Sequence, residues 1–160
     1  MDTCVAGSVC FEAIGRAATN TAFIDLILMN TFRVVAGDTP DHAKAIFYGL
    51  DSVKSRREIT RKLANANGHG AEVFSLLDEL ARVAKAANIA RIELTHAYMR
   101  CSQESENPGL CLKDSRHLIQ PIKDVYIEKH VCTTIESVRR ATSLYERLCT
   151  LLDARPDLTF

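Results

Sequence analysis

The amino-acid sequence predicts an all-α protein, a single domain over residues 1–160 that folds into a bundle of four or five helices. Apolar residues recur at spacings of three and four over most of the chain, as they do on the buried face of a helix. The chain is 47% hydrophobic and 25% charged, which is typical of a globular domain that buries its own core. An irregular segment is expected before the last helix.

Three helices are expected in the first half of the chain, from Cys10 to Val35, from Pro40 to Gly49 and from Val53 to Ala66. Proline is favoured at the first position of a helix, and Ser52 can cap the third helix. The stretch from Asn65 to Gly70 is rich in helix breakers and predicts a loop.

The fourth helix, from Val73 to Tyr98, has the most regular pattern. Its stripe alternates between spacings of three and four residues: Val73, Leu77, Leu80, Ala84, Ala87, Arg91, Leu94 and Tyr98. A narrow stripe of this kind suits packing against another helix. It therefore favours a homodimer.

The pattern fails between Ser102 and Lys129, which predicts the irregular segment. Within it, Val125 to Ile127 is predicted as a short strand because of its β-branched and aromatic residues. Thr133 is expected to cap a final amphipathic helix, which Arg155 and Pro156 close.

The charge of the chain is balanced, with 20 Lys and Arg residues against 20 Asp and Glu residues. Contact with a polyanion therefore requires a local patch of cations. The chain shows no secretory signal, and its most apolar stretch, 23–29, is far shorter than the roughly 20 residues of a membrane span. The cysteines form no Cys-x-x-Cys pair, as is typical of reduced thiols. We expect a cytoplasmic protein that does not contact a membrane.

Arg91 and His96 are the first candidates for chemistry. Five residues turn about 140° around a helix, yet both side chains can reach into a groove beside it. There Arg91 would bind phosphate oxygens, and His96 would transfer protons near neutral pH. The alternative is structural: Arg91 forms an ion pair with Asp78, Glu79 or another acid, or extends its head into water.

The segment from Ala87 to Ala97, Ala-Asn-Ile-Ala-Arg-Ile-Glu-Leu-Thr-His-Ala, resembles the motif of HEPN domains (higher eukaryotes and prokaryotes nucleotide-binding), in which a histidine follows an arginine by a few residues. The resemblance implies an all-helical dimer. It also implies a metal-independent endoribonuclease of a toxin-antitoxin or other defence system. In that family, the arginine and histidine of both protomers line the cleft that cleaves RNA.

On this resemblance, Arg91 holds the scissile phosphate, and His96 is the acid or base of a transesterification at the ribose 2′-hydroxyl. RNA is then the ligand, an antitoxin is a candidate partner, and no cofactor is needed. The family commonly has a polar residue after the arginine, whereas this chain has Ile92. The alternative is a non-catalytic, dimeric regulatory or adaptor protein in which Arg91 is structural.

A second candidate site is the basic face of the third helix. Lys54, Arg57 and Arg61 share one face of the helix and are candidates for binding nucleic acid. A solvated face explains the same pattern, since Glu58 is placed to pair with Lys62 and no aromatic residue lies among the cations.

Candidate zinc ligands are His96, Cys101, Cys111 and His117, with His130 and Cys132 beyond them. Their spacing matches no compact zinc motif, because such a site needs two close pairs of ligands. We therefore predict no metal.

Overall fold

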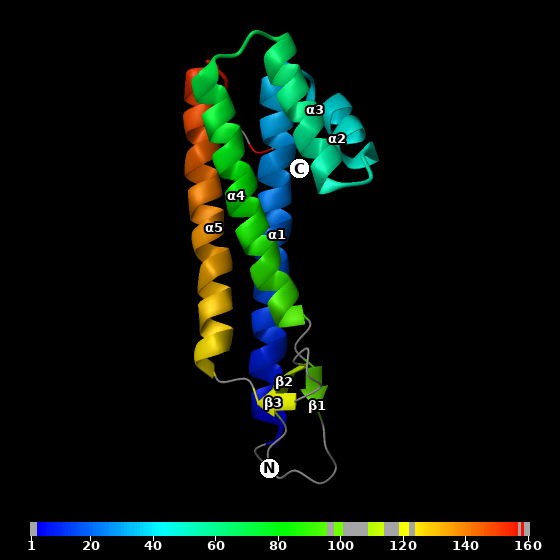
Figure 1. Cartoon of the computed structure of the whole chain (residues 1–160), viewed down its shortest axis with the longest axis vertical. Coiled ribbons are helices and arrows are strands. Elements are labelled where there is room, and N and C mark those ends of the chain that lie inside the picture. Colours follow the sequence, from blue (N-terminus) through cyan, green and yellow to red (C-terminus); the bar gives the residue numbers. More distant parts are fainter. Residues whose placement is uncertain are drawn as a thin grey trace. The chain divides into compact units, whose positions relative to one another are not determined.

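The structure is a computed structural model, which describes residues 3–95, 98–100, 109–113, 119–121, 124–156 and 158, with side chains for 11–95, 127–156 and 158. Its helices are α1 (Thr3–Ala36), α2 (Pro40–Gly49), α3 (Val53–Ala66), α4 (Ala71–Thr95) and α5 (Asp124–Leu151), as Figure 1 shows. The predicted all-α class with four or five helices is confirmed, and the number is five.

The two short helices begin where the sequence predicts. Pro40 is the first residue of α2, where its missing N–H leaves no helical bond unmade. Ser52 caps α3, because its hydroxyl accepts a hydrogen bond from the backbone N–H three residues further on, at 3.0 Å. Before α2, the carboxylate of Asp38 accepts hydrogen bonds from the backbone N–H of Thr39 and from the ring of His42, both at 2.8 Å.

Three helices end in the same way. α1, α3 and α5 are each followed by a residue with positive φ, namely Gly37 at 67°, Gly68 at 70° and Asp153 at 49°. In each case the next backbone N–H donates to the carbonyl five residues earlier, at 2.8–3.1 Å. Glycine has no Cβ to oppose this left-handed conformation, whereas Asp153 does.

A small antiparallel sheet, not predicted from the sequence, lies between α4 and α5. Its strands are hydrogen-bonded in the order β1 (Tyr98–Arg100), β2 (Gly109–Lys113) and β3 (Ile119–Pro121). Tyr98 pairs with Cys111 in β2 and so belongs to a strand, whereas the sequence predicts it in the last turn of the fourth helix. α4 ends at Thr95 instead.

The last helix begins earlier than predicted. The predicted strand at Val125 to Ile127 and the predicted helix start at Thr133 are both wrong, because α5 begins at Asp124. Thr133 lies inside α5, where its hydroxyl donates to the carbonyl of Lys129 at 2.8 Å. Ile127 is buried, and packing of this apolar face outweighs the weak strand preference of its residue type.

The chain divides into two compact units, and α1, α4 and α5 each contribute to both. The first unit comprises residues 1–21 and 86–136. In its core, Ala13 and Ala17 of α1 pack with Leu94 of α4 and Ile127 of α5. The amide of Asn20 donates to the hydroxyl of buried Thr134 at 3.0 Å, which joins α1 to α5 by a polar contact. The single domain over residues 1–160 stays a prediction.

The second unit comprises residues 22–85 and 137–160 and contains parts of all five helices. Met29 and Phe32 of α1 pack with Ala43 and Phe47 of α2, and Ile59 and Leu63 of α3 lie against them. The rings of Phe32 and Phe47 are 5.9 Å apart between centroids. The loop after α3 closes the end of α1, because the amide of Asn67 donates to the carbonyl of Val35 at 2.8 Å.

The apolar stripe of α4 packs inside the chain. Among the members whose side chains the structure describes, five are buried, namely Val73, Leu77, Leu80, Ala87 and Leu94. This stripe is the feature of the sequence that favours a homodimer, but its buried members are already covered by the chain's own helices. The dimer therefore stays a prediction that depends on the family resemblance. Arg91 shares the stripe and is half-buried.

Replacing Asp153 by glycine is expected to raise the free energy of unfolding by about 0.5–1 kcal/mol, because glycine adopts the left-handed conformation without a Cβ clash. Thermal and urea unfolding would measure the change. The control is Ser143→Gly at an exposed position inside α5, which should lower the free energy of unfolding by about 1 kcal/mol. Equal losses in both variants would contradict the expectation.

Candidate functional site

Arg91 lies in the last two turns of α4 and is half-buried in the first unit. Its Nε and Nη2 donate to the side-chain Oδ1 of Asn88, at 3.3 and 2.9 Å. The two residues are three positions apart and so share one side of the helix. An amide oxygen is neutral. Asn88 therefore orients the guanidinium without cancelling its charge.

The acids expected to neutralise Arg91 have other partners. Asp78 accepts hydrogen bonds from Arg57 and Arg61 of α3, and Glu79 accepts one from Nε of Arg140 of α5 at 2.9 Å. The ion pair of Arg91 with Asp78 or Glu79 is therefore not formed, whereas the other forms of the structural alternative, an ion pair with another acid or a head in water, stay predictions. In the part of the chain that the structure describes, no carboxylate pairs with Arg91.

His96 lies outside the described residues, so its distance from Arg91 stays a prediction. The side chains of Cys101, Cys111 and His117 also lie outside the described residues, so their part in a zinc site is not tested. Where side chains are described, no group of three or more His, Cys, Asp or Glu residues is placed to hold a metal ion.

His130 is half-buried on α5, in the first unit. Burial lowers the pKa of its ring, the carboxylate of Glu93 on α4 raises it, and Lys129 lowers it, with a net decrease. The carboxylate of Glu93 therefore acts on an imidazole of the neighbouring helix.

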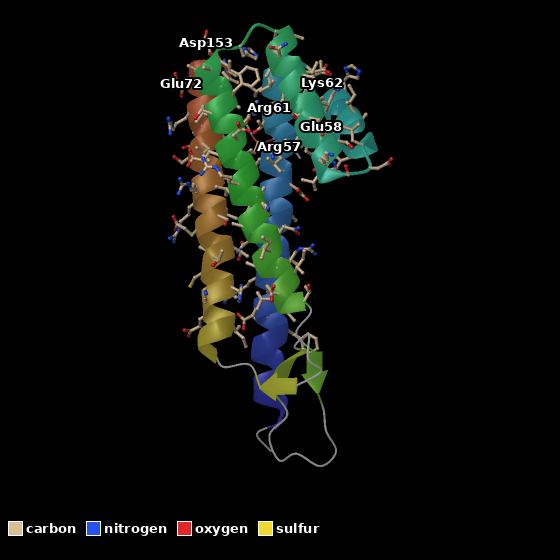
Figure 2. All side chains as sticks on the ribbon, in the orientation of Figure 1. Arg57, Glu58, Arg61, Lys62, Glu72 and Asp153 are labelled. Atoms are coloured by element: carbon tan, nitrogen blue, oxygen red, sulfur yellow. The ribbon has the colours of Figure 1, made fainter. Side chains whose placement is uncertain are left out.

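Two arginines of α3 share one carboxylate of α4. Nη2 of Arg57 and Nη1 of Arg61 lie 3.1 and 2.5 Å from Oδ1 of Asp78, and Figure 2 shows both arginines on the side of α3 toward α4. Desolvation by itself would raise the pKa of Asp78, but the hydrogen bonds from Arg61 and Arg57 outweigh it and hold the pKa below its usual value. One carboxylate thus faces two guanidinium groups.

The basic face of α3 keeps most of its charge in contact with solvent. The side chain of Lys54 is 85% exposed, and its Nζ is 3.8 Å from the carboxylate of Glu58, so Glu58 pairs with Lys54 and not with Lys62 as expected. The side chain of Arg57 is 55% exposed. α3 carries five cations and one carboxylate, so its exposed side remains positive. A role in binding nucleic acid stays a prediction.

Aromatic rings, which the sequence of α3 lacks, are supplied by neighbouring helices. The guanidinium carbon of Arg56 lies 5.1 Å from the ring centroid of Phe47 and 5.3 Å from that of Tyr48, both on α2. The guanidinium of Arg61 lies 5.2 Å from the ring centroid of Phe74 on α4. These are distances at which a cation is attracted by an aromatic face. The short connection between α2 and α3 is the signal in the sequence that could have suggested this neighbourhood.

Comparisons of the chain with protein-family models, curated proteins and solved structures found no match. None of the helices in the described part combines the length and apolar character that a membrane crossing demands.

Asp78→Asn is expected to make stability less dependent on pH. The pKa of Asp78 is lowered in the folded chain, so its carboxylate stabilises the fold above the unfolded value of about 3.9, and this contribution is lost as the pH falls through the folded value. The side chain is 45% exposed, so the difference at pH 7 should be no more than about 1 kcal/mol.

Urea unfolding of the parent and of Asp78→Asn between pH 7 and pH 2 measures this contribution, and the two curves should converge at the acid end. Glu72→Gln, an exposed acid on the first turn of the same helix, serves as the control and should follow the parent at every pH. A constant difference between parent and Asp78→Asn would show that the ionisation of Asp78 is not responsible.

Proposed function

We propose that this chain is an RNA-directed protein of the HEPN type that acts as a metal-independent endoribonuclease. The observation that supports the proposal is the environment of Arg91, whose half-buried guanidinium is oriented by Asn88 and has no carboxylate partner among the described residues. A guanidinium that keeps its charge in a fixed orientation is suited to binding a phosphate. The resemblance of residues 87–97 to the family motif adds His96 as the proton carrier.

In the proposed reaction, the ribose 2′-oxygen attacks the adjacent phosphorus, and the bond from phosphorus to the 5′-oxygen of the next nucleotide breaks. His96 removes the proton of the attacking 2′-hydroxyl or supplies a proton to the departing oxygen. Arg91 binds the non-bridging phosphate oxygens and offsets the negative charge that develops on them. A second Arg91 and His96 pair from a partner protomer would supply the other half of the cleft.

The test is incubation of total RNA with the purified parent, Arg91→Ala and His96→Ala in the presence of EDTA. We expect the parent to cleave and His96→Ala to lose about 100-fold or more of the rate, as befits a general acid or base. Arg91→Ala should lose cleavage as well. All three proteins are first compared by circular dichroism and by mass in solution. Undiminished cleavage by a folded His96→Ala protein would eliminate the proposal.

Two further variants separate phosphate binding from a structural role of Arg91. Asn88→Asp places a carboxylate where the amide now holds the guanidinium, so it should neutralise Arg91 and lower RNA cleavage without lowering thermal stability. Lys85→Ala removes an exposed cation of the same helix and should leave cleavage unchanged. Full cleavage by Asn88→Asp would indicate that the charge of Arg91 is not used.

A second candidate function is favoured by the outward side of the same segment of α4. Ile89 is 48% exposed, and Ile92, three residues further on, shares its side of the helix and is half-buried. Ile92 stands where the family commonly has a polar residue, and together with Ile89 it suits contact with another helix. The chain would then be a non-catalytic, dimeric regulatory protein in which Arg91 is structural.

In this second case Ile89→Lys should convert a dimer into a monomer, because it places a charge in the contact between copies. Light scattering after size-exclusion chromatography measures the mass. Ile46→Lys, a matched exposed isoleucine on α2, should leave the mass unchanged. A monomeric parent, or a dimer that survives Ile89→Lys, would argue against a contact at this side of α4.

A further inference from the structure

Three arginines lie around the carboxylate of Glu79 where α4 and α5 run side by side in the second unit (Figure 1). Nε and Nη2 of Arg140 on α5 both donate to Oε1 of Glu79 on α4, the former at 2.9 Å. Arg82 is three residues beyond Glu79 and therefore lies on the same side of α4. Arg147 is two turns beyond Arg140, on the same side of α5.

The pKa of Glu79 responds to all three arginines. The hydrogen bond from Arg140 lowers this pKa, desolvation raises it, and the positive charges of Arg140, Arg82 and Arg147 lower it further, with a net decrease. Arg82 and Arg147 are therefore close enough for their charges to act on the carboxylate. Since three guanidinium groups surround one carboxylate, the cluster has an excess of two positive charges.

The cations of this cluster are accessible to a ligand. Arg82 and Arg147 are exposed, and the side chain of Arg140 is 58% exposed. Among the described residues, the side chains of Arg82 and Arg147 form no hydrogen bond and no close ion pair, and their charges act on Glu79 from a greater distance. Only Arg140 is held directly by the carboxylate.

The other acids of these two helices lie at the margins of the cluster. Glu72 is two turns before Glu79 on α4, which is about 10 Å along the helix axis. Glu146 lies about 100° around α5 from Arg147, and Glu136 belongs to the first unit. The centre of the cluster therefore keeps its positive excess.

The surroundings of the three arginines favour phosphate over other ligands. A guanidinium binds phosphate oxygens in a bidentate geometry. Among the described residues, cations lie over aromatic rings only at Arg56 and Arg61 of α3, so this cluster offers no ring on which a base could stack. Contacts to phosphates alone do not read the base sequence.

We propose that Arg82, Arg140 and Arg147 form a surface that binds the phosphate backbone of RNA without contact to its bases. The inference rests on the proposed function for the choice of RNA as ligand. It adds a second contact with the same ligand, located in the second unit, whereas Arg91 lies in the first. Affinity at this surface is expected to depend on salt and not on base sequence.

The alternative occupant is an acidic protein segment. A protein interface of usual size has an apolar centre. Within the described part of the second unit, the one large exposed hydrophobic residue on α4 or α5 is Leu151, at the end of α5. The exposed residue between Arg140 and Arg147 on their side of α5 is Ser143, which is small and polar. The surface therefore fits a phosphate backbone better than it fits a protein.

The test measures the binding of a labelled oligouridylate of about 12 nucleotides by fluorescence anisotropy, beside an abasic ribose-phosphate chain of equal length. Both ligands carry 2′-O-methyl groups, so the proposed nuclease cannot cleave them. The parent should bind the two ligands equally. Arg82→Gln and Arg147→Gln should each weaken both ligands about 5-fold at about 0.1 M salt, and reduce the slope of log affinity against log salt by about 0.7, the value for one phosphate contact.

Glu79→Gln should change binding in the opposite direction. It removes the negative charge from the cluster and frees Arg140, so binding of both ligands should tighten about 5-fold and the salt slope should steepen by about 0.7. Lys44→Gln is the matched control, because it removes an exposed cation of α2 in the same unit and should leave binding unchanged. Circular dichroism first establishes that each variant is folded. A loss of stability cannot produce the tighter binding expected of Glu79→Gln.

Three results would overturn the inference. The first is parent-like affinity and salt slope in a folded double variant, Arg82→Gln with Arg147→Gln. The second is a parent that binds oligouridylate but not the abasic chain, which would indicate recognition of bases. The third is tighter binding of an oligoglutamate of equal charge than of RNA, which would indicate an acidic protein as the occupant.

The same variants separate this inference from the proposed nuclease. Arg91→Ala and His96→Ala should lose cleavage and keep the binding that depends on Arg82 and Arg147. Binding that requires these two arginines in a parent that does not cleave RNA would support the phosphate-binding surface and refute the nuclease. Cleavage by a parent whose binding is unchanged in the double variant would do the reverse.

Discussion

The buried face of α4 is the constraint on which the other features depend. Val73, Leu77 and Leu80 pack in the second unit, and Leu94 packs in the first, so this one helix contributes to both cores. Burying the stripe fixes the rotation of α4. The sides of α4 next to the stripe are thereby oriented toward the neighbouring helices. Asp78 accepts hydrogen bonds from the two arginines of α3, and Glu79 accepts one from Arg140 of α5.

The positions of these two acids determine which cations have a carboxylate partner. Asp78 and Glu79 are engaged with other helices, and Arg91 on the same helix is left with the amide of Asn88. Arg56 also has no carboxylate partner among the described residues, because its guanidinium contacts the rings of Phe47 and Tyr48 instead. Neither an amide nor a ring removes a proton or a charge. Both guanidinium groups therefore remain able to attract an anion, although the net charge of the chain is zero.

Most of the helices could be predicted because their signals are local. The proline that begins α2, the serine that caps α3 and the glycine after α1 each act within one turn, and the predicted bounds at these three places are close to those found. α1 has no such signal at its start and begins at Thr3, seven residues before the predicted Cys10. The errors occur where tertiary contacts decide. A hydroxyl at Thr133 fits a cap or a helix interior equally well, and only the packing of Ile127 extends α5 back to Asp124. The short strands β1 to β3 pair across segments too brief to show alternation.

The candidate sites show the same limit at the level of side chains. Periodicity places Lys54, Arg57 and Arg61 on one face, but it cannot say that Asp78 lies 17 residues beyond Arg61 and across from it, nor that Tyr48 meets Arg56. Such contacts depend on how helices turn back on each other. A charge pattern read from one helix alone therefore overestimates the cations that are unpaired, as with Arg57 and Arg61, and misses the aromatic rings that a neighbouring helix supplies. Knowing which cations are paired matters most for a chain of zero net charge. Any affinity for RNA must then arise from the few cations that the fold leaves without carboxylate partners.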